Sequence, residues 1–448
     1  MKRKLSSVAF IAVILTICCV PSLGMLLPQQ GEAGGNQALA RRPALRDAEG
    51  KLNAEYPAQM ARYLEDNYFL RQDMITAWSA LNDRVLHTSI SDSVIRGTDG
   101  WLYFADTLDD YTGLGPMERR DLFSAARNLS LMREYCEGLG ARFLFTIAPN
   151  KNSLYPEHMP RFSSLGGGRN AAGLTAGLAE EGVPYLDLFT VFREQDETLY
   201  FTQDSHWNSK GAALAADAVC RELGETSDYF AGPFSPEADH KSDLYDMLYP
   251  AGRALETDQK YDGELNFTYD SPIRGPDSLT IMTSGASGGG SLVMFRDSFG
   301  NLLYPYLADH FASALFSRST YRVNLAQQRE ADFVVLELVE RNLPYLIQNI
   351  PVMPAPARDA LRPARTVDTS CGLAAEASDE LEGFLLVTGS FPAGGFDEDS
   401  PVYLTSGAEW YEAFLLEDGG FGGYVPESAL DSLGVAFLRN GEVVQAAR

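Results

Sequence analysis

Apolar and polar positions follow two different periods between residues 117 and 350. Short runs of consecutive apolar residues are separated by stretches in which apolar residues recur every three or four positions, as on one face of a helix. The apolar runs are RFLFTIA (142–148), VPYLDLF (183–189), SLVMF (291–295), SALFS (313–317) and DFVVLEL (332–338). The predicted helices lie at 117–138, near 169–181, at about 208–222 and over NLLYPYLADHFA (301–312). Buried strands that alternate with helices predict an α/β fold with a mainly parallel sheet.

The pattern differs on either side of this region. Helical periodicity begins near Tyr56, and SVIRGTDGWLYF (93–104) has the alternation and the turn of a β-hairpin. Residues 225–290 show little periodicity and predict an irregular excursion over the surface near the active edge of the sheet. Short apolar runs with glycine-rich turns predict a small all-β appendage over 366–448. The main domain is therefore expected at 54–365.

The N-terminal segment predicts export from the cytoplasm. Three basic residues precede an unbroken apolar run over 8–20, which is the form of a secretory signal. The apolar stretch resumes after Pro21, so residues 1–28 are interpreted as a signal peptide or a membrane anchor. Residues 29–53 are rich in glycine, alanine and charge and are interpreted as a tether. The remaining chain is then expected to be extracytoplasmic, either anchored to the membrane by its N-terminal segment or secreted.

The charge balance excludes one class of partner. The chain has 448 residues, with 36 Lys and Arg against 61 Asp and Glu, which gives a net charge of −25 at pH 7. Such a chain repels phosphates, so nucleic acid is not an expected ligand. Outside the export segment the cysteines are Cys136, Cys220 and Cys371, an odd number that does not indicate a disulfide scaffold.

The segment VMFRDSFGNLLYPYL (293–307) carries a candidate nucleophile. Ser298 follows a predicted strand and precedes a predicted helix, which is where ligands bind in open α/β sheets. Backbone N–H groups and the positive end of the helix can stabilise an oxyanion there, and Gly300 allows a tight turn. A serine at this point is also suited to cap the helix, as is Asp297, so the segment alone leaves both roles open.

Of the five histidines, His206 is the best placed to act as a base. It lies in FTQDSHWNSKG (201–211), in a loop before a predicted helix and two residues after Asp204. Residues i and i+2 of an extended chain point the same way. Asp204 can therefore bind one imidazole nitrogen and leave the other free to take a proton from a serine. Two alternatives stay open: Asp-x-His can ligate a metal, although no second histidine cluster offers further ligands, and Asp204 or Asn208 can simply cap the helix.

Four segments, in this order, resemble the SGNH-hydrolase-like proteins of bacterial envelope polysaccharide O-acetylation, a group that includes the alginate O-acetyltransferase and DHHW proteins. They are VIRGTDGWLYF (94–104), FTIAPNKNSLYPEHMP (145–160), YFTQDSHWNSKGA (200–212) and FRDSFGNLLYPYLADHF (295–311). The resemblance covers residues 55–350. It implies an SGNH-type three-layer α/β sandwich, acyl transfer through an acetyl-serine and a polysaccharide hydroxyl as acceptor. It also implies a membrane-bound O-acyltransferase as the partner that delivers acetyl groups.

The resemblance assigns a catalytic triad to Asp204, His206 and Ser298, which occupy the positions of the family's Asp-x-His motif and its late serine. The sequence departs from the family pattern at two positions. Ser205 stands where the DHHW name expects a histidine. Arg296 stands where many members have glycine, so the geometry of the oxyanion hole is left open. Arg296 is expected to contact substrate or an anion, or simply to lie at the surface.

Further residues are candidate substrate contacts because of their positions. Lys151 and Asn152 leave the end of a predicted strand; Lys151 could hold a sugar or buttress the loop, and Asn152 could donate to an oxyanion. Arg341 leaves the end of another strand and is expected to pair with Glu340 beside the site. Trp207 could stack on a sugar ring or wedge the start of its helix against the core.

Together these observations predict an extracytoplasmic O-acetyltransferase that modifies a cell-envelope or secreted polysaccharide. Its first rival is a carbohydrate esterase, in which water replaces the sugar hydroxyl at the same triad. A second rival is a catalytically silent glycan-binding scaffold with the β appendage as its binding module. No cofactor and no metal is expected.

Overall fold

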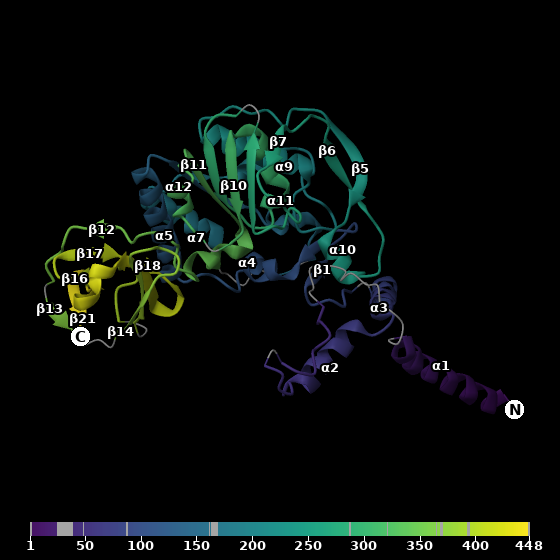
Figure 1. Ribbon diagram of the computed structural model, residues 1–448. Helices are drawn as coiled ribbons and strands as arrows, with labels where there is room; N and C mark the ends of the chain where they lie inside the picture. Colours follow the sequence, from purple (N-terminus) through teal and green to yellow (C-terminus); the bar gives the residue numbers. More distant parts are fainter. Residues whose placement is uncertain are drawn as a thin grey trace.

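The computed structural model describes residues 2–24, 39–47, 49–86, 88–160, 162, 169–285, 288–319, 321–363, 365–367, 371–391 and 395–446. Figure 1 shows a central body of strands and helices, with the N-terminal helices at one end and a strand-rich C-terminal unit at the other. Residues 29–38 of the predicted tether lie outside the described residues.

A seven-stranded sheet forms the centre of the main body, in the order β4-β3-β11-β9-β10-β8-β7. The strands are β3 (Arg142–Ala148), β4 (Tyr185–Leu186), β7 (Phe267–Tyr269), β8 (Thr280–Gly285), β9 (Ser291–Phe295), β10 (Ser313–Ser317) and β11 (Phe333–Val339). The first five strands in this order are mutually parallel, whereas β8 and β7 are antiparallel to their neighbours. The predicted mainly parallel sheet is confirmed.

Helices cover both faces of the sheet because successive strand side chains point to opposite sides. On β11, Val335 and Val339 pack into one core with α8 (Leu188–Arg193), α9 (Ser209–Glu222) and α11 (Gly300–His310). Val334 and Leu336 pack into the other core with α5 (Arg119–Gly138) and α7 (Asn170–Glu180). Each buried aliphatic side chain contributes about 1.5–3 kcal/mol, so a one-residue slip of β11 would be very costly. This fixes the strand ends that carry the site.

Two sequence predictions differ from the structure. The run 183–189 forms only the short β4, because the Asp187 side chain accepts a hydrogen bond from Thr190 N and starts α8. The stretch 225–290 is more ordered than expected. It contains a two-stranded ribbon, β5 (Phe234–His240) with β6 (Glu256–Tyr261), the helix α10 (Asp243–Leu248), and the two antiparallel strands of the main sheet. Its sequence shows little periodicity because most residues of β5 are exposed.

The C-terminal region is rich in strands, as predicted. It forms a six-stranded sheet, β12-β17-β16-β20-β21-β13, and a four-stranded sheet, β14-β15-β19-β18, around one apolar core. The strands are β12 (Ala357–Arg358), β13 (Arg365–Val367), β14 (Gly372–Ala377), β15 (Phe384–Ser390), β16 (Val402–Ser406), β17 (Glu409–Glu412), β18 (Phe414–Leu415), β19 (Gly420–Pro426), β20 (Leu433–Arg439) and β21 (Glu442–Ala446). The unit docks on α5, where Arg127 pairs with the buried Glu412 and Asn128 bonds the backbone of Leu415.

The N-terminal part consists of α1 (Lys2–Gly24), α2 (Tyr56–Asn67), α3 (Arg71–Leu86) and the hairpin β1 (Val94–Arg96) with β2 (Leu102–Phe104). The hairpin and the helical periodicity near Tyr56 agree with the sequence pattern. Within the described residues, no helix combines the length and apolarity needed to cross a membrane.

Candidate functional site

Ser298 lies between the end of β9 and the start of α11, at the carboxyl edge of the parallel strands. The neighbouring Asp297 shapes this turn: one carboxylate oxygen accepts from Phe299 N at 2.9 Å and the other from Val339 N at 2.8 Å. Val339 ends the adjacent strand β11, so the turn is tied to the sheet. A side chain at Gly300 would collide with that of Arg296, so the close approach there requires glycine.

His206 bridges Ser298 and Asp204. Its Nε2 lies 2.9 Å from Ser298 Oγ, and its Nδ1 lies 2.7 Å from Asp204 Oδ1. The carboxylate can only accept, so Nδ1 carries the proton and Nε2 is left to accept from the serine hydroxyl. The structure thus brings together the three residues that the sequence singled out, in one hydrogen-bonded series from Asp204 through His206 to Ser298.

The loop before α9 is held by its own neighbours. Asn208 caps the helix, because its side chain accepts from Gly211 N at 2.8 Å. Trp207 is fully buried, stacks on Phe192 and donates from Nε1 to the carbonyl of Phe299 at 3.1 Å. Of the two alternatives left open for Trp207, the structure agrees with the second: its ring wedges the helix start against the core and has no exposed face for a sugar.

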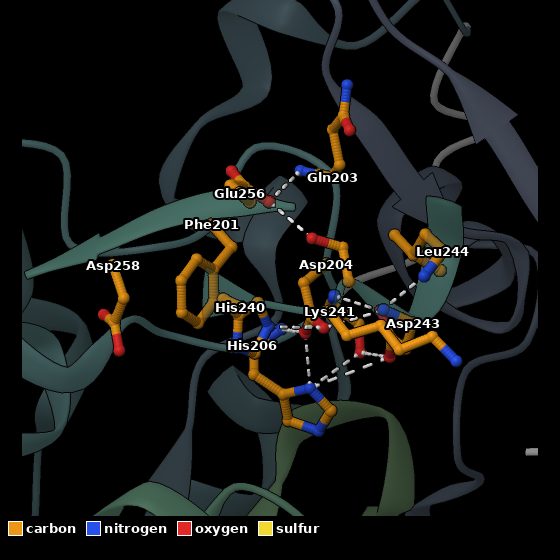
Figure 2. A network of polar contacts seen from close by, with 12 residues as sticks. Phe201, Gln203, Asp204, His206, His240, Lys241, Asp243, Leu244, Glu256 and Asp258 are labelled. Atoms are coloured by element: carbon orange, nitrogen blue, oxygen red, sulfur yellow. Dashed lines mark hydrogen bonds and ion pairs between the residues drawn. The ribbon is translucent and has the colours of Figure 1, made fainter. Parts of the chain in front are cut away.

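Asp204 has four hydrogen-bond donors. Oδ1 accepts from the backbone N of His206 at 2.9 Å as well as from Nδ1. Oδ2 accepts from His240 Nε2 at 3.0 Å and from Asp243 N at 2.8 Å. Figure 2 shows these side chains converging on the carboxylate. Sequence reasoning missed His240 and Asp243, because they lie in the segment EADHKSD, 36 and 39 residues from Asp204, and no local pattern links the two segments.

Asp204 and His206 stabilise each other's charged forms. Burial would raise the pKa of Asp204, but the charges and hydrogen bonds of His206 and His240 hold it well below its usual range. Burial would lower the pKa of His206, but Asp204 and then Asp243 raise it above its ordinary value. A carboxylate that stays ionised beside a strengthened imidazole base is the electrostatic arrangement that general-base catalysis needs. The pKa of Asp243 is raised by burial and by the charge of Asp204.

Lys151 and Asn152 are buried and do not face a ligand. Lys151 Nζ donates to the carbonyls of Phe201, Thr202 and Asp204, at 3.1, 3.0 and 2.5 Å. It therefore buttresses the triad loop, and the alternative of holding a sugar is excluded by its burial. Asn152 is buried and donates from its amide nitrogen to Thr107 Oγ1 at 2.8 Å; its role as an oxyanion donor stays a prediction.

The two candidate arginines differ in their surroundings. Arg296 is buried and donates to the carbonyl of Pro276 and to Asn301, so it is a structural part of the serine turn rather than a surface residue. Arg341 lies over the rings of Phe104 and Phe299, at 5.3 and 5.6 Å from their centroids. Among the described residues no carboxylate forms an ion pair with it.

The expected pairing of Arg341 with Glu340 is wrong. Glu340 points the other way, into the sheet edge, where it accepts from Asn150 N, Ser153 Oγ and Arg169. Burial raises the pKa of Glu340 to about 7. Consecutive residues of the 3-10 helix η3 (Glu340–Ile347) point in different directions, which the sequence alone could not resolve.

Asp204, His206 and Asp243 are close enough to be considered as metal ligands, since one ligand atom from each lies within 4.8 Å of the others. Their hydrogen bonds argue against that use. Both oxygens of Asp204 already receive two donors each, and Asp243 accepts from Ser205 N and Ser205 Oγ. Because the lone pairs that a metal would need face N–H and O–H groups, this donor set fits a hydrogen-bonded triad better than a cation site.

Comparisons with known proteins agree with the sequence resemblance. Residues 94–250 match the family model of the SGNH hydrolase-like domain of the acetyltransferase AlgX. The probable alginate O-acetylase AlgJ of Pseudomonas syringae pv. tomato is 24% identical over 216 residues, which are 44% of this chain and 51% of that protein. The chain thus spans about half the length of the curated relative it matches.

Two solved structures are also similar. Bacillus cereus PatB1, solved with a sulfonyl adduct, aligns with 57% of this chain and 97% of its own, at 15% identity and a TM-score of 0.43. The O-acetyltransferase domain of Pseudomonas putida AlgJ aligns with 56% of this chain and 92% of its own, at 19% identity and a TM-score of 0.38. The resemblance to the SGNH-like O-acetyltransferase group that the sequence motifs indicated is confirmed by the family match.

Proposed function

We propose that this protein is an O-acetyltransferase that transfers an acetyl group to a hydroxyl of a polysaccharide through an acetyl-serine intermediate on Ser298. The observation that carries the proposal is the continuous hydrogen-bonded series from Asp204 through His206 to Ser298, with contacts of 2.7 and 2.9 Å. Those distances lie within the range in which a base can take a proton without rearrangement of the site.

The reaction has two half-steps. His206 Nε2 takes the proton of Ser298 Oγ while the oxygen attacks the acetyl carbonyl, and the donor's leaving group departs with that proton. A sugar hydroxyl then attacks the acetyl-serine and gives its proton to His206. The proton returns to Ser298 as the new ester leaves. Asp204 keeps the imidazole oriented and stabilises its cationic form in both half-steps.

The oxyanion of each tetrahedral intermediate needs donors beside Ser298. Asp297 N and Phe299 N are engaged, with Glu337 and with the Asp297 side chain respectively. The backbone N–H of Ser298 takes part in no hydrogen bond among the described residues. It lies at the start of α11, where the helix dipole favours negative charge. We assign the oxyanion to this N–H group.

Two features beside the triad suit an acidic glycan. Arg341 presents a guanidinium without an ion pair among the described residues, over the ring of Phe299, which follows Ser298. A cavity of about 360 Å³ next to the serine turn is lined by Arg296, Asp297, Arg318 and Tyr345, among others. Tyr345 is half exposed and offers a ring face to a sugar. The lining residues of this cavity include neither Ser298 nor Arg341. We propose that the acceptor reaches Ser298 from this side and that Arg341, over the ring of Phe299, binds an acidic group on it.

The setting of the reaction follows from the N-terminal segment and the resemblance. We propose that the site works outside the cytoplasm, because the basic and apolar N-terminal residues have the form of an export segment. In the O-acetylation systems that the chain resembles, a membrane-bound O-acyltransferase delivers the acetyl group, and we propose a partner of that class. Fractionation of cells that express the full chain tests the location, since recovery with the cytosolic fraction would contradict it.

The triad is tested with a serine-reactive fluorophosphonate probe, which needs the nucleophile and base but no natural substrate. We expect labelling of the wild-type protein and none of Ser298→Ala or His206→Ala. Ser291→Ala is the matched control, because Ser291 lies at the opposite end of the same strand β9. Labelling that persists in the Ser298 and His206 variants would remove the triad assignment and leave the silent scaffold as the better reading.

Acetyl transfer is then measured by mass spectrometry of an acidic glycan incubated with a surrogate acetyl donor. The proposal expects a gain of acetyl groups that depends on Ser298. If an acetylated glycan loses acetyl groups and no glycan gains any, the protein is a carbohydrate esterase with the same triad.

A further inference from the structure

The triad aspartate is shared by two histidines. His206 binds Oδ1 of Asp204, and His240 binds Oδ2 through its Nε2 at 3.0 Å. His240 ends β5, in the ribbon that lies outside the main sheet (Figure 1). Figure 2 shows its imidazole reaching the Asp204 carboxylate, where it binds the oxygen that His206 does not bind. None of the hydrogen bonds described for His240 involves Ser298, so it can act on the reaction only through Asp204.

The ring of His240 is held in place by stacking. It lies parallel to the ring of Phe201, with 3.7 Å between the centroids and an angle of 5°. Phe201 belongs to the same loop as Asp204. His240 therefore contacts this loop twice, through its hydrogen bond to Asp204 and through its stacking on Phe201. Glu256, which is paired with His240 across the ribbon, adds a third contact by accepting from Thr202 N and Gln203 N.

The geometry of Asp204 depends on these outer contacts. A carboxylate can turn about the bond that joins it to the chain, and its near neighbours fix only one oxygen: His206 N and Nδ1 both bind Oδ1. Oδ2 is fixed by two groups from the stretch 225–290, here called the insertion: His240 Nε2 and Asp243 N. Without His240, Asp243 N is the described donor that remains at Oδ2, so the plane of the carboxylate is held less firmly. A small change of this plane misaligns His206 with the serine and slows the reaction, whatever the basicity of the ring.

We propose that His240 is a positioning residue of the catalytic site: it orients Asp204 from the outer side and thereby sets the alignment and basicity of His206. The inference rests on the proposed function, because it requires the serine and His206 to act as nucleophile and base. It also gives the 225–290 insertion a role in the reaction, as the element that completes the triad.

Electrostatics predict the direction of the effect. A donor at Oδ2 draws negative charge away from the oxygen that faces His206. Removing that donor strengthens the pull of Asp204 on the imidazole proton, so His206 should become more basic. The other charged groups around the two imidazoles stay constant in the variants. They are Asp243 on α10, Lys151 on α6 (Lys151–Leu154), Glu256 on β6 and Arg341 on η3.

The test compares His240→Ala and His240→Gln with the wild type in the rate of fluorophosphonate labelling across pH. We expect His240→Ala to label about tenfold more slowly, the effect of one hydrogen bond to a charged group. The acid limb of its pH–rate profile, where labelling falls as His206 becomes protonated, should move to higher pH. Glutamine also carries an N–H donor and should restore most of the rate and the original limb. His310→Gln is the matched control, because His310 is also half-buried beside a carboxylate, that of Glu225, but lies at the end of α11.

Each outcome decides the question. A slow His240→Ala rescued by glutamine, with the acid limb shifted, supports the proposal. Equal rates and equal pH profiles in wild type and His240→Ala overturn it. If His240→Ala and His240→Gln are slowed equally and the acid limb of the pH–rate profile does not shift, His240 acts through its packing on Phe201. The positioning role is then wrong. Loss of folding in the alanine variant leaves glutamine as the test, since a slow glutamine variant contradicts the donor role. If the wild type is not labelled at all, the proposed function itself fails, and this inference fails with it.

Discussion

Replacing Asp204 by asparagine changes one oxygen into an amide group while leaving the size of the side chain almost unchanged. In the native site the two oxygens accept from four N–H donors, two at each oxygen. Asparagine has one acceptor and one donor end, so it can satisfy only one pair. If the amide oxygen faces His206, its NH2 group opposes His240 Nε2 and Asp243 N. If it faces outward, the NH2 group opposes His206 and forces the proton of that ring onto Nε2, where it blocks the serine.

Either orientation should be costly to catalysis. The wrong histidine tautomer, or the loss of the carboxylate charge, lowers kcat by about a thousandfold to ten-thousandfold in a serine, histidine and aspartate triad. The structural cost should be smaller. Leaving a buried donor unpaired costs about 1–3 kcal/mol, so two such donors should lower the free energy of unfolding by about 2–6 kcal/mol. The raised pKa of His206 should also fall, because Asp204 is the first of the groups that raise it.

The assay is the fluorophosphonate labelling rate as a function of pH, with thermal unfolding of each variant measured beside it. Asp258→Asn is the matched control. Asp258 is fully buried and accepts from Ser209 N, Ser209 Oγ and Gln259 N, so asparagine should disturb its hydrogen bonds similarly. None of those donors belongs to the triad. We expect the control to lose stability while labelling at nearly the wild-type rate.

The reasoning would be refuted by an Asp204→Asn variant that keeps more than about a tenth of the wild-type rate at a pH where His206 is neutral, since the loss expected is at least a hundred times larger. It would also be refuted if Asp258→Asn lost as much activity as Asp204→Asn, because a shared loss of stability would then explain both.

Three further changes test other parts of the site. In the wild type, kcat/KM should fall as the pH drops through the pKa of His206, because only the neutral imidazole accepts a proton. The midpoint of this fall should lie above 6.5, the ordinary pKa of histidine. A midpoint at or below 6.5 in the pH–rate profile would contradict the charge arrangement around His206. Lys151→Met leaves three carbonyls without their donor and should lower the free energy of unfolding by about 2–4 kcal/mol in a urea titration, partly offset because burial already lowers the pKa of this lysine to about 8. Arg341→Gln should raise KM for an acidic glycan about tenfold while labelling stays within about twofold of wild type; an unchanged KM would exclude Arg341 from acceptor binding.

The sequence predicted those parts of the fold that depend on local pattern. Continuous apolar runs located the five parallel strands, since a strand buried on both faces must be apolar throughout. The spacing of Asp204 and His206 was also readable, because residues two apart on an extended chain share a side. The position of Ser298 after β9 followed from the general rule for open sheets.

The contacts that could not be predicted are those between distant segments. His240 and Asp243 meet Asp204 only because the insertion folds back as a ribbon, and the exposed residues of β5 have no periodicity that reveals it. Burial was similarly hidden for Lys151 and Trp207. A lysine is ordinarily solvated, and its burial here depends on carbonyls that the loop turns inward. For Trp207, a large aromatic side chain suits both stacking on a sugar and packing in the core. The two roles therefore cannot be distinguished from the residue type, and only the surroundings of the ring in the structure distinguish them.

Besides their contacts with one another, the three residues of the proposed triad are each held by contacts with other residues. Ser298 is set by Asp297, which binds the backbone of the next strand. The loop of His206 is held in place by Trp207, whose Nε1 donates to the carbonyl of Phe299. Trp207 follows His206 and Phe299 follows Ser298, so this bond ties the two segments together. Asp204 is set from the insertion. Because these contacts hold the proposed triad before substrate arrives, the reactive alignment would require little further ordering, which is how the proposed reaction would gain a lower activation barrier. It follows that changes in these supporting contacts should reduce kcat more than they raise KM.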